Sequence, residues 1–227
     1  MMMKFARSFS VARAVGEKIG GGLHREAIRT SLSRDALALS ELKSRIDEDG
    51  LIRAASCIHE CRSARGRVLV SGVGKSGIVA RRMAASLAST GTPAHFVHAA
   101  EFMHGDLGAA QERDAVLMYS HSGNTEECTA AAEWLRRRDG VALISIVGCA
   151  DSELGRTSDH VVSYEYPNDT EAYREPLGSV PTTSLVVQEA VSNAIICCLM
   201  HEIDFDEKDF SLNHPGGSIG KRLSSHH

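Results

Sequence analysis

The stretch AVLMYSHSGNTEECTAAAEWLRRR, residues 115–138, decides the fold of this chain. It begins with a continuous apolar run, Ala115–Tyr119, of the kind that forms a strand buried on both faces. A short turn of hydroxyl residues and a glycine follows, and the segment 126–138 then has helical character. This order of strand, loop and helix is the repeating unit of a parallel sheet covered by helices.

The turn itself predicts a binding site for an anion. Ser120, Ser122 and Thr125 offer three hydroxyls within six residues, directly before the free backbone N–H groups of a helix N-terminus. A single Ser or Thr there would be an ordinary helix cap. Because three hydroxyls and a glycine exceed what a cap needs, we favour a phosphate site.

The same alternation of short apolar runs and helical segments extends along the chain on both sides. It predicts a three-layer α/β/α sandwich with a five-stranded parallel sheet, preceded by an N-terminal helical segment. The expected strands are 67–71, 94–98, 115–120, 141–147 and 160–163, and the expected helices are 33–65 with a break at 47–50, 76–90, 126–138 and 182–201.

A second loop, Gly72–Gly77, follows the first expected strand. It matches G-x-G-x-x-G, the dinucleotide fingerprint, but that signal alone is weak. A nucleotide P-loop is excluded because its first glycine would stand where the chain has Leu69. The loop instead lets the backbone approach a ligand closely and offers it Lys75 and Ser76; the alternative is a tight turn with an exposed lysine.

Two later segments add candidate residues. Thr182 and Thr183 open the last long helix, and two acidic residues, Glu171 and Glu175, precede them. Near the C-terminus His214 stands before Pro-Gly-Gly, an irregular backbone of the kind that carries function more often than packing.

Composition narrows the class of protein. The net charge of −4 over 227 residues, with scattered basic residues, gives no footprint for nucleic acid. The six cysteines form no CxxC pair, which disfavours a zinc site and fits a reducing, cytoplasmic setting.

The most apolar late segment, Ala190–Met200, is interrupted by polar residues, so no membrane span is expected. Residues 1–22 are basic and glycine-terminated; we favour a frayed N-terminus over a transit peptide.

The loops together resemble the sugar-isomerase (SIS) domain family, and in particular the isomerase domain of arabinose-5-phosphate isomerases. The resemblance is collinear from about residue 67 to residue 222. Full-length members usually carry a pair of C-terminal CBS domains; we expect this chain to be an isomerase domain alone, spanning 34–223 between a flexible or partly helical N-terminus (1–33) and a tail (224–227). The matching segments are 72–77, 84–93, 98–108, 120–125, 181–184 and 214–217.

The resemblance implies roles for individual residues. His214 would reach the site of a neighbouring subunit, which implies a homo-oligomer, and a tetramer in particular. His104 and His121 would lie near the site. The implied catalytic residues are Lys75, Glu127, Glu171 and His214, and the implied phosphate-binding residues are Gly74, Ser76, Ser120, Ser122, Thr125, Thr182 and Thr183.

The chain also departs from the family pattern. The stretch resembling E-A-C-P-L-G is two residues longer here, so either Glu171 or Glu175 matches the second carboxylate, and we favour Glu171 because Ala172 follows it. His121 stands where Asn is common, and Asn124 where Glu is common.

The expected function is an aldose–ketose isomerase of a phosphorylated sugar, in particular of D-ribulose 5-phosphate and D-arabinose 5-phosphate, without a metal or organic cofactor. Two alternatives stay open: a SIS isomerase of a hexulose or heptulose phosphate, and a non-catalytic sugar-phosphate-binding module.

Overall fold

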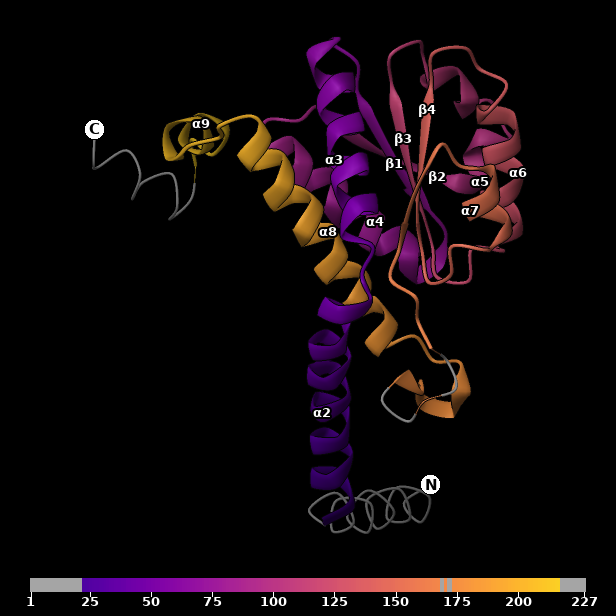
Figure 1. The fold of residues 1–227 in the computed structure, drawn as a ribbon, viewed down its shortest axis with the longest axis vertical. Helices are drawn as coiled ribbons and strands as arrows, with labels where there is room; N and C mark the ends of the chain where they lie inside the picture. The colour runs from indigo at the N-terminus through magenta and orange to yellow at the C-terminus, as the bar shows by residue number, and fades with distance from the viewer. Residues whose placement is uncertain (1–21, 168–169, 171–172, 217–227) are drawn as a thin grey trace, which may run out of the picture.

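A five-stranded parallel sheet forms the centre of the protein. The computed structural model describes residues 22–167, 170 and 173–216 (Figure 1). The strands lie in the order β2-β1-β3-β4-β5. All five predicted strands are confirmed to within one residue at each end. Their bounds are β1 Val68–Gly72, β2 Ala94–His98, β3 Ala115–Ser120, β4 Ala142–Val147 and β5 His160–Ser163.

Burial explains why these runs form strands. Every residue of β1 and of β3 is buried, as their continuous apolar character predicts for inner strands of a parallel sheet. The register pairs Val68 with Ala115 at one end and Gly72 with Tyr119 at the other. The two strands therefore end side by side, and so do the loops that follow them.

Helices cover both faces of the sheet and complete the predicted sandwich. The core divides accordingly into one cluster beneath α3, α4 and α8 and a second beneath α5, α6 and α7 (Figure 1). On the first face lie α3 (Glu48–Ser63), α4 (Gly74–Ser89) and α8 (Thr183–Glu202). On the second face lie α5 (Ala99–Phe102), α6 (Glu126–Leu135) and α7 (Glu153–Thr157). Three more short helices are η1 (Asp106–Ala109), η3 (Pro176–Gly178) and α9 (Glu207–Asn213).

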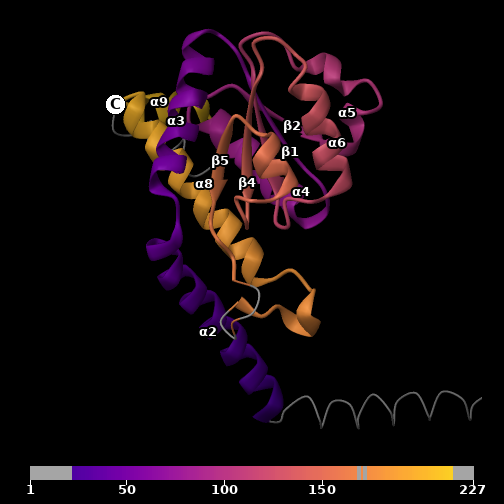
Figure 2. The same cartoon turned by 45° about the vertical axis from the view of Figure 1, so that its right-hand side comes forward.

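The helix α2 (Gly22–Arg45) extends away from this body as an arm (Figures 1 and 2). It begins earlier than the expected start at residue 33. Its C-terminal half packs on the body through Ala38, which is fully buried, whereas Ile28 and Leu32 are 60% and 65% exposed. The predicted break between α2 and α3 is confirmed around Asp47, whose side chain accepts a hydrogen bond from the backbone N–H of Gly50.

The expectation that no segment has the character of a membrane span was wrong for α8. By length and composition this helix is apolar enough to cross a membrane, because its polar residues are few and mostly uncharged. Half of it is nevertheless buried within the protein, where it packs on α2, α3 and α4. Core helices of soluble proteins commonly have this character.

Candidate active site

The sheet has a topological switch point between β1 and β3. From β1 the chain crosses to β2 on one side, and it later adds β3 on the other side. The helices that follow the two strands, α4 and α6, consequently lie on opposite faces. In open α/β sheets ligands bind in the crevice that opens at such a point, beyond the carboxyl ends of the strands. The two predicted loops follow β1 and β3 directly, so they lie on either side of this point.

The first loop turns directly into α4. The helix begins at Gly74, which has a left-handed φ of 58° that suits glycine. Lys75 is exposed and Ser76 half-buried, both in the first turn, where backbone N–H groups have no partner within the helix. A Cβ on Gly77 would lie 2.9 Å from the carbonyl oxygen of Gly72, so this glycine permits close packing of helix on strand. The first turn of α4 is thereby held at the crevice.

In the second loop two of the three hydroxyls brace the turn. Ser120 is buried; its Oγ lies 2.8 Å from Oγ1 of Thr125 and accepts a hydrogen bond from the backbone N–H of Gly123 at 3.1 Å. Ser122 is exposed, and its Oγ accepts from the N–H of Asn124 at 3.1 Å. Ser122 therefore offers its own proton outward, and it is the hydroxyl of this loop best placed for a ligand.

Glu127 lies in the first turn of α6 and is exposed. Its neighbour Cys128 is buried, and burial, together with the charge of Glu127, raises the pKa of the thiol to about 12. The same thiol interacts with the backbone of Val73, the residue before α4. The start of α6 is thus close to the residue before α4, so the helix turns that carry Lys75, Ser76 and Glu127 lie near one another.

The N-terminus of α8 is occupied by the chain's own carboxylate. Glu175 accepts hydrogen bonds from the backbone N–H groups of Thr182, Thr183 and Ser184, at 2.9, 3.3 and 2.9 Å, and from the Thr182 hydroxyl at 2.6 Å. Burial alone would raise the pKa of Glu175, but the hydrogen bonds from Ser184 and Thr182 outweigh it and hold the pKa below its usual value. The Thr183 hydroxyl bonds to Asp35 of α2 at 2.8 Å. Both threonine hydroxyls are therefore engaged within the protein.

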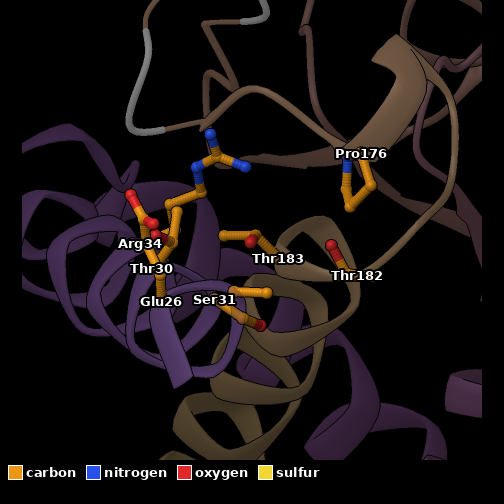
Figure 3. Close-up of a pocket in the computed structure, with 8 residues that line it drawn as sticks. Glu26, Thr30, Ser31, Arg34, Pro176, Thr182 and Thr183 are labelled. Atoms are coloured by element: carbon orange, nitrogen blue, oxygen red, sulfur yellow. The ribbon is translucent and has the colours of Figure 1, made fainter. Parts of the chain in front are cut away.

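A cavity of about 480 Å³ lies between α2 and the start of α8 (Figure 3). In Figure 3 Thr182 and Thr183 face the α2 residues across this space. The cavity is lined by Glu26, Ala27, Thr30, Ser31, Arg34, Pro176, Thr182 and Thr183.

The structure separates His214 from the crevice. Asn213, next to it, donates a hydrogen bond to the carbonyl of Ser89 at the far end of α4, and His214 itself stacks on Phe210 with ring centroids 3.9 Å apart. The helix α4 has sixteen residues, with Gly74 at its start and Ser89 at its end. Its two ends are therefore roughly 20–25 Å apart. Within one chain His214 therefore cannot take part in the site formed by the two loops.

The remaining predicted residues are placed as follows. His104 is exposed in the turn after α5, where its backbone N–H bonds to the carbonyl of Glu101. His121 is half-buried in the second loop and lies edge-on to Tyr166, with centroids 4.7 Å apart. Glu171 lies outside the described residues. Among the residues that the structure describes, no group of three His, Cys, Asp or Glu side chains could hold a metal ion.

Sequence reasoning missed two buried residues that bond to the predicted loops, Tyr164 and Gln188. Tyr164 directly follows β5 and is 2% exposed; Gln188 lies on α8 and is fully buried. The tyrosine hydroxyl bonds to Nδ1 of His121 at 2.9 Å, and the Gln188 amide bonds to the Ser76 hydroxyl at 3.1 Å. One sequence signal could have identified Gln188. It is the one amide side chain in the mostly apolar run LVVQEAV of a predicted helix.

The protein is an open α/β sheet with two loops at its switch point, and these loops and the helix turns after them carry hydroxyls, a lysine and a carboxylate. The SIS domain model matches residues 61–197, so the chain belongs to the SIS domain family.

Individual relatives carry more specific names than the family model does. Arabinose 5-phosphate isomerase KpsF of Escherichia coli is 36% identical over 197 residues, and arabinose 5-phosphate isomerase GutQ of Salmonella typhimurium LT2 is 39% identical. The matches cover 87% and 86% of this chain, which spans 58% of the length of each relative. A solved structure, that of E. coli CFT073 c3406 in complex with arabinose 5-phosphate, has a TM-score of 0.72 and 37% identity, with 84% of this chain and 96% of that chain covered.

Proposed function

We propose that this chain catalyses aldose–ketose isomerisation of a phosphorylated sugar, interconverting D-ribulose 5-phosphate and D-arabinose 5-phosphate. The observation that carries the proposal is that the first turns of α4 and α6, which hold Lys75, Ser76 and Glu127, begin close together, with Ser122 in the loop before α6. Hydroxyls and helix N-termini suit a phosphate, while a carboxylate and a lysine suit proton transfer and charge stabilisation. The names of the KpsF and GutQ relatives and the arabinose 5-phosphate complex of c3406 support the same substrate.

The reaction needs one base and a means of stabilising negative charge. From the open-chain aldose the base takes the C2 proton; the C–H electrons form the C1–C2 double bond, and the carbonyl electrons move to O1. Lys75 stabilises this enediolate. Return of the proton to C1, with transfer of the O2 proton to O1, gives the ketose, so atoms and charge balance. Phosphate bound at Ser76 and Ser122 holds the carbon chain in place during both transfers.

Glu127 is our candidate for the base. It is exposed, whereas Glu175 accepts four hydrogen bonds that keep its pKa low and make it a weaker proton acceptor. Glu171 is the rival, in keeping with the family resemblance, and would then take the role of base or help to open the sugar ring. Thr182 and Thr183 stay in the proposal as phosphate-binding residues, and their hydroxyls would have to leave Glu175 and Asp35 to reach the phosphate.

We further propose that the active protein is a homo-oligomer, a tetramer, located in the cytoplasm. His214 would then complete the site of a neighbouring copy, because it lies at the far end of α4 from its own loops. The exposed Ile28 and Leu32 of α2 provide apolar surface for packing between copies. The six cysteines are all free, as expected in a reducing compartment.

The role of Glu127 is tested by proton exchange. Purified protein is incubated with arabinose 5-phosphate in D₂O, and loss of the C2 proton is followed by NMR. Glu127→Gln should bind the substrate normally but lose about 10²–10⁴-fold in exchange and turnover. Normal exchange in that variant would remove Glu127 as the base. If wild-type protein turns over no phosphorylated pentose, hexose or heptose yet binds one, the chain is a binding module.

The role of His214 is tested by mixing subunits. Glu127→Ala and His214→Ala proteins are each expected to be inactive. After subunit exchange at equal amounts, about a quarter of the sites would combine an intact Glu127 with an intact neighbouring His214, if each site takes its histidine from one randomly chosen neighbour. Mixtures that exchange subunits and stay inactive would show that each chain builds its own site.

A further inference from the structure

A chain of buried hydrogen bonds connects the two loops of the crevice. Nε2 of Gln188 lies 3.1 Å from Oγ of Ser76 and 3.1 Å from the hydroxyl of Tyr164. That hydroxyl in turn lies 2.9 Å from Nδ1 of His121. Gln188 is fully buried and Tyr164 nearly so, so the bridge is shielded from water. It links the first turn of α4 to the Ser120 loop through α8.

The amide of Gln188 decides which group donates in each of these hydrogen bonds. A side-chain NH₂ group has two protons and no lone pair to share, so it donates to both Ser76 and Tyr164. Each of these hydroxyls then accepts from the amide and directs its own proton elsewhere. Among the described residues Nδ1 of His121 is the acceptor within reach of the Tyr164 proton, and this arrangement requires the ring to carry its own proton on Nε2. The Ser76 proton is left for another acceptor, in the turn where the phosphate is expected.

Packing requirements do not explain this amide. Its carbonyl oxygen, Oε1, is buried and has no hydrogen-bond partner among the described residues. A buried acceptor without a donor is unfavourable, and an apolar side chain such as methionine would fill the same volume without that cost. The reversed amide would let Oε1 accept from both hydroxyls, but it would consume the Ser76 proton and leave the NH₂ group unpaired. The observed arrangement is the one that keeps Ser76 a donor.

We infer that Gln188 is a positioning residue, which fixes the Ser76 hydroxyl as a donor to the substrate phosphate and, through Tyr164, fixes His121 as its Nε2–H tautomer. This inference rests on the proposed function, since it takes a phosphate as the acceptor of the Ser76 proton. His121 also stands at the position where the chain departs from the family pattern, so the tautomer bears on which sugar hydroxyl the ring can meet.

A double-mutant cycle tests the Ser76 arm. Inorganic phosphate is titrated by calorimetry into wild type, Ser76→Ala, Gln188→Met and the double variant, with thermal unfolding as a check of folding. We expect each single substitution to weaken phosphate binding by about tenfold, and the double variant to be no weaker than Ser76→Ala. Unchanged binding in folded Gln188→Met, or fully additive losses, would overturn the assignment. Tyr164→Phe leaves the amide–Ser76 bond in place and should therefore weaken phosphate binding less than Gln188→Met does; an equal or larger loss in Tyr164→Phe would contradict the Ser76 assignment.

The His121 arm is tested without ligand or turnover. Nitrogen-15 NMR of the histidine ring should show a protonated Nε2 and a bare Nδ1 in wild type, and a mixture of tautomers in Tyr164→Phe. A His121 ring protonated at Nδ1 in wild type would contradict the assignment of Tyr164 as the donor to that nitrogen. This readout separates the inference from the proposed function. Wild-type protein that binds neither inorganic phosphate nor sugar phosphate would refute the function and the Ser76 arm, while the tautomer would still decide the His121 arm.

Discussion

Replacing Glu175 by glutamine tests how the start of α8 is held. The carboxylate accepts four hydrogen bonds at the positive end of a twenty-residue helix. Glutamine retains one acceptor oxygen, so at least the bond from Ser184 is lost, together with the attraction between the charge and the helix end. For a partly exposed group we expect a loss of about 1–2 kcal/mol in the free energy of unfolding. In a chain of this size that corresponds to roughly 2–8 °C in Tm.

The loss should depend on pH in a definite direction. The folded-state pKa of Glu175 lies below the ordinary value of 4.5. Its charge therefore contributes stability above pH 4.5, and this contribution is lost as the pH falls through the lower folded-state pKa. Urea unfolding of wild type and Glu175→Gln should differ at pH 7 and converge in acid. Glu133→Gln, an exposed change in the last turn of α6, is the charge-matched control and should cost under about 0.5 kcal/mol. An equal gap at both pH values would refute the reasoning.

Two further substitutions examine the Ser120 loop. Ser122→Ala should weaken sugar-phosphate binding about tenfold in calorimetry, because it removes a hydrogen bond to a charged group; unchanged affinity would mean that the loop only caps α6. Gly123→Ala should lower the free energy of unfolding by about 1–3 kcal/mol, because φ is +65° and the new Cβ would overlap Oγ of Ser152. Gly108→Ala, where nothing lies within 4 Å of the Cβ, is the matched control in the same urea titration; equal losses in the two variants would contradict the steric argument.

The sheet could be predicted from sequence because its strands are buried on both faces. Val68–Val70 and Ala115–Tyr119 are continuous apolar runs for that reason, and this continuous apolar character locates them. The start of α2 could not be predicted in the same way. Its first turns are mostly exposed and mixed in polarity, so no apolar stripe identifies them.

The loops of the site were predictable because each follows a strand directly in sequence. The Gln188 bridge was not, since it requires α8 to cross the carboxyl end of β5 so that residues far apart in sequence meet. The occupied N-terminus of α8 was missed for a related reason. Hydroxyls before a helix predict an anion there, but the sequence does not reveal that Glu175 folds back to supply it.

His214 follows α9 and lies at the far end of α4. This position has a consequence for how the protein must be assayed. If a neighbouring chain finishes each site, the activity per molecule is a function of protein concentration. Dilution below the dissociation constant of the assembly would then abolish turnover while every chain stays folded. A substitution on the exposed face of α2 would have the same effect, and in a single-concentration assay it would be indistinguishable from a change in the chemistry.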